Sequence, residues 1–148
     1  MPACFANPLQ SESVSFLADV LKQRRRVLLP VSAAIGAYHI ANRYLGVPRV
    51  AVRRVLGGLL DSGSPALYPS ITPRLAGDAL EYASSYGVES WDGYLIALAK
   101  ATGSGMIYSL DRELGRVKEI TVASPFSEEA VRRYHTFLQS RLRKQKAR

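Results

Sequence analysis

The sequence predicts an α/β fold, a three-layer α/β/α sandwich in which helices cover both faces of a mostly parallel central sheet. Two observations predict it: short apolar runs alternate with segments of helical periodicity along the chain, and Gly or Pro separates most neighbouring segments. This alternation favours parallel pairing, because each helix carries the chain back to the start of the next strand. With 148 residues, 47% of them apolar, residues 1–148 are expected to form a single domain with a buried core.

The first half of the chain is predicted to contain three helices and two strands. Ser11 and Ser32 precede apolar residues at helical spacing and are expected to cap the first two helices, and Gly46 is expected to close the second. Pro48 is expected to begin the third helix, because its fixed φ suits a first turn. The expected elements are a helix from Ser11 to residues 22–25, a strand at 26–30, helices from Ser32 to Gly46 and from Pro48 to residue 60, and a strand at 66–70.

The second half is predicted to contain three more helices and two more strands. Thr72 followed by Pro73 is a pairing typical of a helix start, and Gly87 is expected to end that helix. Ser90 is expected to cap the next helix and Ser127 to precede the last one. The expected elements are helices at 73–86 and 91–102, strands at 106–110 and 119–123, and a long final helix from Ser127.

The charge of the chain favours a polyanionic partner. Twenty Lys and Arg against twelve Asp and Glu give a formal net charge of +8 and a pI near 9.9, which favours nucleic acid over a membrane surface. The basic residues gather at 24–26, 49–54 and 132–133 and in a tail at about 140–148 that is expected to fray. Each cluster is either a phosphate contact or a solvated face.

Composition also limits the class of protein. No apolar run reaches the roughly 20 residues that cross a bilayer, so no membrane-spanning helix is expected. One cysteine and two histidines offer neither an intramolecular disulfide nor a Cys/His metal cluster. The expected location is therefore the cytoplasm.

Two aspartates occupy positions that favour a site at one edge of the sheet. Asp111 directly follows the strand predicted at 106–110, and Asp92 lies in the first turn of the helix that follows Ser90. Ligand sites of parallel α/β folds lie at the carboxyl ends of the strands, so both carboxylates are expected at the same edge. The alternative for Asp92 is a purely structural interaction with the helix dipole, and for Asp111 it is the start of a turn.

The segment SWDGYLIALAKATGSGMIYSLDREL, residues 90–114, resembles the carboxy-terminal signature of PIN domains, the metal-dependent nucleases that include VapC-type toxins of toxin–antitoxin pairs. That signature is an aromatic residue, Asp, an apolar helix, a short glycine-containing loop, an apolar strand, then Thr or Ser, one residue and Asp. Trp91, Asp92, Ser109 and Asp111 match it position for position. The order of the other expected helices and strands is also similar to that of the family.

The resemblance implies a metal-dependent endoribonuclease of the toxin–antitoxin type. Asp92 and Asp111 would belong to a carboxylate cluster that holds Mg²⁺ or Mn²⁺, hard cations that prefer oxygen ligands. Metal-activated water would hydrolyse RNA phosphodiesters, and Ser109 would orient a ligand or a water molecule. The resemblance also implies an antitoxin peptide bound in an apolar groove and a homodimer formed through apolar helices.

The chain departs from the family pattern in two places, so its acidic site is degenerate. PIN domains usually begin with a strand that ends in Asp, whereas this chain has no apolar strand and no acidic residue before Glu12. Where the family has a Glu six residues after the next strand, this chain has Gly36. Two of four expected carboxylates are absent, which predicts weak metal binding and little or no nuclease activity. A strand carrying the first Asp is expected upstream of Met1, so the amino terminus looks truncated.

Two further interpretations stay open beside an active nuclease. One is a catalytically impaired PIN-like module that binds nucleic acid or protein, and the other is an unrelated α/β protein with a chance pair of aspartates. The remaining titratable groups are expected to be structural. Glu89 is expected to be a helix-entry charge, Glu113, Asp19, Asp61 and Asp78 to be solvated, and His39 to be a packed or surface histidine.

Overall fold

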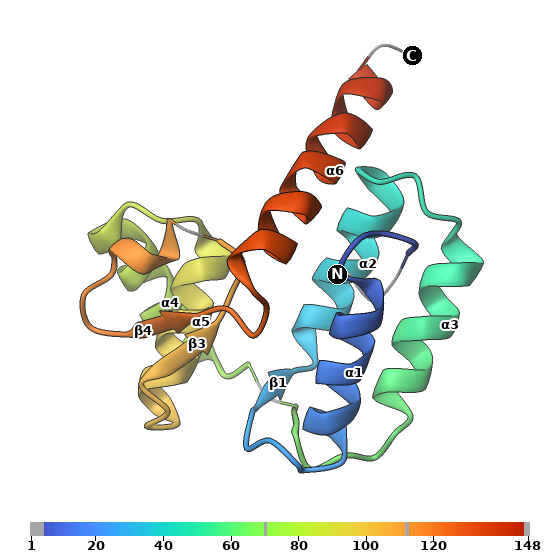
Figure 1. The fold of residues 1–148 in the computed structure, drawn as a ribbon. Coiled ribbons are helices and arrows are strands. Elements are labelled where there is room, and N and C mark those ends of the chain that lie inside the picture. Colours follow the sequence, from blue (N-terminus) through green and yellow to red (C-terminus); the bar gives the residue numbers. More distant parts are fainter. Residues whose placement is uncertain (1–4, 70, 112, 147–148) are drawn as a thin grey trace. The chain divides into compact units, whose positions relative to one another are not determined.

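The chain folds into two compact units of mixed helix and strand (Figure 1). This computed structural model describes residues 5–69, 71–111 and 113–146, with the backbone alone for 144–146. Unit 1 comprises Met1–Ser70 and Phe126–Arg148, and unit 2 comprises Ile71–Pro125. Among the described residues, each unit contains one pair of parallel strands, which confirms the α/β class and the parallel pairing. The three-layer sandwich and the single domain over residues 1–148 stay predictions.

Unit 1 contains four helices and one short strand pair among its described residues. They are α1 (Gln10–Leu21), β1 (Leu29–Pro30), α2 (Ser32–Arg43), α3 (Arg49–Leu60), β2 (Leu67–Tyr68) and α6 (Glu128–Lys146). The strands pair in register, Leu29 with Leu67 and Pro30 with Tyr68. The end of the predicted tail, residues 147–148, lies outside the described residues.

The core of unit 1 lies between α2 and α3. Ala34 and Ala41 of α2 are seven residues apart and therefore share one face, which packs against Val52 and Leu56 of α3. Small side chains on one partner allow two helix axes to approach closely. A hydrogen bond from the Ser64 hydroxyl to the Leu21 carbonyl oxygen, at 2.6 Å, connects the end of α1 to the segment before β2.

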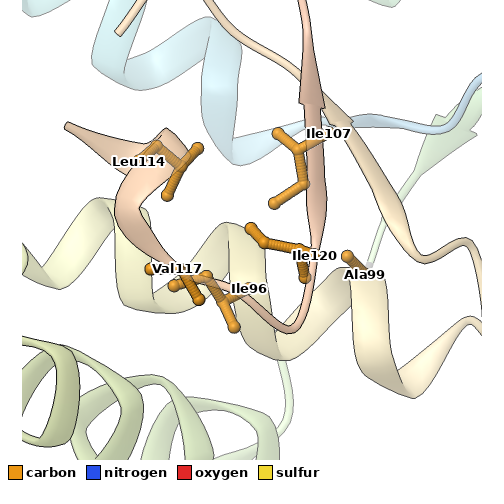
Figure 2. Packing of buried hydrophobic residues seen from close by; sticks show 6 residues of the cluster. All are labelled: Ile96, Ala99, Ile107, Leu114, Val117 and Ile120. Atoms are coloured by element: carbon orange, nitrogen blue, oxygen red, sulfur yellow. The ribbon is translucent and has the colours of Figure 1, made fainter. Parts of the chain in front are cut away.

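Unit 2 consists of a helix pair followed by a strand pair. Its elements are α4 (Pro73–Tyr86), α5 (Ser90–Ala101), β3 (Met106–Tyr108), the 3-10 turn η2 (Leu114–Arg116) and β4 (Thr121–Ala123). β3 and β4 run parallel, with Ile107 opposite Val122. Figure 2 shows the buried cluster that joins these elements, formed by Ile96, Ala99, Ile107, Leu114, Val117 and Ile120. Helix α5, strand β3 and the turn η2 therefore share one hydrophobic core, against which Tyr82 of α4 and Val122 of β4 also pack.

The helix pair of unit 2 crosses at Gly93 of α5. An added Cβ at this glycine would overlap the Ala79 carbonyl oxygen of α4 and would lie 2.9 Å from both the backbone nitrogen and the Cβ of Ala83. Real Cβ atoms do not approach backbone this closely, so only glycine fits at the crossing. The contact fixes the first turn of α5 against α4.

The predicted caps of the helices are confirmed at some ends and wrong at others. The Leu75 N–H donates to the Thr72 hydroxyl oxygen at 3.1 Å, and Gly87 has φ +62° at the end of α4, both as predicted. The predictions for Ser11 and Ser90 are wrong, because α1 and α5 begin one residue earlier and neither has a side-chain cap.

Two other helix ends also differ from the prediction. α2 ends before Tyr44 rather than at Gly46, and Pro48 precedes the third helix rather than beginning it. The described N-cap of α2 is Val31, so Ser32 is inside the helix rather than its cap. The final helix begins at Glu128, directly after Ser127 as predicted, and the Ala130 N–H donates to the Ser127 hydroxyl oxygen at 3.3 Å. None of the described helices is long and apolar enough to cross a membrane.

Candidate acidic site

Asp92 is a charged residue that is nearly buried in unit 2. It lies in the first turn of α5, three residues after the N-cap Glu89, and only 9% of its surface is exposed. The sequence explains the burial, because the next residue is the glycine that contacts α4 and the residue after it, Tyr94, is also buried. The first turn of α5 is therefore held against the body of unit 2, and the Asp92 carboxylate is held with it.

The electrostatic surroundings of Asp92 are acidic. Burial raises the pKa of the Asp92 carboxyl above its ordinary value, and the charges of Asp111, Glu89 and Glu113 raise this pKa further. Two chain segments separated by a helix and a strand therefore bring their carboxylates within electrostatic reach of each other. These four residues, Glu89, Asp92, Asp111 and Glu113, are called the acidic cluster below.

Asp111 organises the turn that follows β3. Its Oδ1 accepts a hydrogen bond from the Glu113 backbone N–H at 2.8 Å, and its own N–H donates to the Ser109 Oγ at 3.0 Å. These are consecutive side-chain turns, which lead into η2. The structural alternative for Asp111 is thus observed. It is compatible with ion binding, because a carboxylate has two oxygens and about four lone-pair directions.

Ser109 fixes the position of Asp111 relative to the strand pair. The Ser109 backbone N–H donates to the Ala123 carbonyl oxygen at 3.1 Å, which continues the pairing of β3 with β4 by one residue. Its hydroxyl oxygen then receives the Asp111 N–H. The observed role of Ser109 is therefore to position the backbone that carries Asp111.

The residues that sequence reasoning underestimated are Glu89 and Glu113. Both are exposed, as expected for a helix-entry charge and a solvated glutamate, yet both influence the Asp92 carboxyl. The signal was present in the spacing, because Glu89 lies three residues before Asp92 and Glu113 two residues after Asp111. His39, on α2, is exposed and contacts the Tyr44 ring at 5.7 Å, as expected for a surface histidine.

The acidic cluster contains Asp92 and Asp111, the two carboxylates to which the resemblance assigns a divalent cation. Within residues 5–69, 71–111 and 113–146, no group of three or more His, Cys, Asp and Glu side chains is arranged to hold a metal. An all-protein cage therefore does not fit. Mg²⁺ is usually held by one or two carboxylates with water and substrate phosphates, and Asp92 with Asp111 suits that chemistry. A cation there would also offset the repulsion among the four carboxylates.

Gly36, the position where a third carboxylate was expected, lies on α2 in unit 1. An added Cβ there would have no neighbour within 4 Å, so this glycine is not required by packing. The strand and Asp that were expected upstream of Met1 lie outside the described residues.

Comparison of the chain with protein-family models, with curated proteins and with solved structures finds no match. The features of the chain that bear on function are therefore the acidic cluster and the resemblance of residues 90–114 to a known signature.

Proposed function

We propose that this chain is a PIN-like protein and a Mg²⁺- or Mn²⁺-dependent endoribonuclease of the toxin–antitoxin type, with the three-layer α/β/α arrangement of that family. The observation that carries the proposal is the convergence of acidic side chains on the nearly buried Asp92. Asp92 and Asp111 occupy the signature positions, and they belong to the same compact unit. The net positive charge of +8 suits an RNA substrate.

In this proposal each residue has a defined task. Asp92 and Asp111 hold the cation, and Ser109 positions Asp111 through its backbone N–H. Bound Mg²⁺ or Mn²⁺ would activate water and neutralise the charge that develops on the scissile phosphate. Burial of Asp92, in a helix turn that packs closely on α4, restricts the movement of its carboxylate.

The proposal includes an antitoxin peptide, a homodimer and a cytoplasmic location. Apolar side chains on the helices of unit 1 support a protein partner. Ile35 of α2 and Val50 of α3 are each 74% exposed, far more than a packed apolar side chain.

The test is cleavage of RNA with and without a divalent cation. Purified protein is incubated with a labelled single-stranded RNA in Mn²⁺ or in EDTA, together with the variants Asp92→Asn and Asp111→Asn. The matched control is Asp78→Asn, because Asp78 is an exposed aspartate of α4 in the same unit. Because two of the four carboxylates of the family are absent, we expect slow Mn²⁺-dependent cleavage by the wild type and the control, and only background cleavage by the two site variants. Equal cleavage by all four proteins would contradict the assignment of the site.

The second candidate is a catalytically impaired PIN-like module that binds nucleic acid or protein. It is favoured by the lack of a third metal-binding side chain among the described residues and by Gly36. In that case Mn²⁺ leaves RNA intact at every concentration while the protein still binds RNA. The same assay, read for binding as well as cleavage, therefore separates the two functions.

A further inference from the structure

The charge of the chain is divided unequally between the two units. Unit 1 contains fifteen Lys and Arg against five Asp and Glu, a net charge of +10, whereas unit 2 contains five against seven, a net charge of −2. The acidic cluster lies in unit 2. The excess positive charge of the protein therefore belongs to the unit that does not contain the candidate site.

Little of the positive charge in unit 1 is neutralised internally. Among the residues that the structure describes there, the one ion pair joins Arg24 and Asp19 at 3.4 Å. An exposed pair of this kind contributes little stability. The basic side chains of unit 1 therefore repel one another, and an anionic partner would relieve that repulsion.

The most regular basic surface in unit 1 runs along α6. Arg132, Thr136, Gln139 and Arg143 are spaced i, i+4, i+7 and i+11, so they share one face of the helix, and all four are exposed. They are called the α6 polar stripe below. The stripe is about 17 Å long at a rise of 1.5 Å per residue. No acidic residue follows Glu129 in the sequence, so nothing on the rest of α6 opposes this charge.

The donors of the α6 polar stripe suit phosphate oxygens. The Thr136 hydroxyl donates to the Arg132 carbonyl oxygen at 3.1 Å, which leaves the two guanidinium groups and the Gln139 amide as the outward donors. Guanidinium groups match the geometry of phosphate and bind it through paired hydrogen bonds.

The opposite face of α6 is occupied, which excludes a membrane as the preferred partner. Ala130, Val131 and Tyr134 are buried, and the Phe137 ring stacks on Phe5 with centroids 6.1 Å apart. A helix that lies in a membrane interface must bury its apolar face in the lipid. The apolar face of α6 already packs within the protein, so its free face is the polar and basic one.

We propose that the α6 polar stripe binds the phosphate backbone of single-stranded RNA, independently of the acidic cluster in unit 2. The choice of RNA rests on the proposed function, while the electrostatic surface itself does not. Binding is sequence-independent, strongly salt-dependent and needs no bound divalent cation, because it uses arginine contacts to phosphate.

The experiment measures RNA binding under conditions that forbid metal-dependent cleavage. The anisotropy of a fluorescently labelled single-stranded RNA of about 20 nucleotides is measured in EDTA as the full chain is added. The titration is repeated at salt concentrations from about 50 to 300 mM, because counterion release makes the affinity fall over this range. The test variant is Arg132→Gln with Arg143→Gln. The control, Arg116→Gln with Lys118→Gln, removes the same charge from exposed positions of unit 2.

A second control lies on α6 itself. Arg141 is two residues from Arg143 but on the other side of the helix, where its guanidinium lies over the Phe137 ring at 5.5 Å. Arg141→Gln and Arg143→Gln therefore make the same change in charge on opposite faces of one helix. Circular dichroism and the thermal midpoint establish that each variant is folded.

Loss of two phosphate contacts should weaken binding about 25-fold at 0.1 M salt and lower the slope of log K against log salt by about 1.4, from about 0.7 per contact. We expect this loss of RNA affinity from the stripe variant, and a change in affinity of no more than about twofold from the unit 2 control. On α6, Arg143→Gln should weaken RNA binding more than Arg141→Gln does. Equal losses from stripe and control variants would overturn the proposal, since binding would then follow net charge alone. Unchanged binding by the stripe variant would overturn it as well.

Two further arms identify the polyanion. Single-stranded DNA of the same sequence should bind with the same salt slope, because the contacts are to phosphate. Vesicles with anionic lipid should bind weakly and equally to wild type and stripe variant, and vesicle binding that depends on the stripe while RNA binding does not would overturn the assignment. Failure of cleavage in Mn²⁺ leaves these results unaffected, so the two proposals fail separately.

Discussion

Substitution of Gly93 by Ala tests whether the close helix crossing holds unit 2 together. The added methyl group would overlap the Ala79 carbonyl oxygen, and the Ala83 backbone nitrogen would be 2.9 Å away. Both of these atoms belong to the backbone of α4, so no side-chain rotation can make room. The two helices must move apart or the helix ends must distort, and either change loosens the first turn of α5 that carries Asp92.

The size of the effect follows from two opposing contributions. Overpacking of a well-packed interface costs about 1–3 kcal/mol, and backbone obstacles place this site at the upper end of that range. Replacing a helical Gly by Ala by itself contributes up to about 1 kcal/mol of stability. The expected net loss is therefore about 2 kcal/mol. For a chain of 148 residues this corresponds to a decrease of roughly 4–8 °C in the thermal midpoint.

The matched control is Gly77→Ala, the same change on α4 of the same helix pair. An added Cβ at Gly77 has no neighbour within 4 Å, so this variant should gain stability from helix propensity alone. Unfolding in urea is followed by the fluorescence of Trp91, the single tryptophan of the chain, which lies in the first turn of α5. Opposite signs are expected for the two variants. If Gly93→Ala were as stable as Gly77→Ala, the close crossing would be refuted.

Two further changes test the acidic cluster and a helix cap. Burial and neighbouring carboxylates raise the pKa of Asp92, so the folded protein favours the protonated carboxyl. The stability that this protonated group contributes is present below the ordinary carboxyl pKa of about 4 and is lost as pH rises through the raised pKa. Asp92→Asn should therefore raise the thermal midpoint at pH 7 in EDTA, and the midpoint of this variant should vary less between pH 4 and 7 than that of the wild type. Mn²⁺ should raise the midpoint of the wild type only. A lower midpoint for this variant would contradict the electrostatic picture. Thr72→Ala removes the acceptor of the Leu75 N–H and should cost about 1 kcal/mol in urea unfolding, whereas Thr72→Ser should cost little.

The sequence predicts the helices well because apolar periodicity reports which face is buried. The helix ends are less predictable, since tertiary contacts compete with local capping. At α1 the fully buried Leu9 precedes the helix, and its N–H donates to the Asn7 side chain at 2.9 Å, so the helix begins before Ser11. At α5 it is Glu89 that has the extended backbone of an N-cap, with φ −63° and ψ 153°.

The strands were predicted in the correct places but were expected to be longer. The five-residue segments predicted as strands at 26–30 and 106–110 pair over only two and three residues. Strand pairing depends on partners that are distant in the sequence, Leu67 for Leu29 and Thr121 for Met106. A local pattern contains no information on how many of those partners are in register.

The positions of Asp92 and Asp111 in the fold were predictable from the sequence, whereas their surroundings were not. The position of Asp92 in a first helical turn and of Asp111 after a strand followed from local pattern. The burial of Asp92 did not, because it depends on the contact of Gly93 with Ala79, fourteen residues earlier. Likewise, the influence of Glu113 on Asp92 depends on the turn that Asp111 organises.

The direction of the Asp92 pKa shift differs from what an interaction with the helix dipole alone would produce. A carboxylate placed only to interact with a helix N-terminus is stabilised in its charged form by the backbone N–H groups, and its pKa falls. The pKa of Asp92 is raised instead, by burial and then by Asp111, Glu89 and Glu113. In the absence of a cation, the ionised side chain therefore opposes folding at neutral pH, which helix stability alone does not explain. A divalent cation between Asp92 and Asp111 would reverse the sign, so a carboxylate that is unfavourable alone becomes favourable when it binds metal.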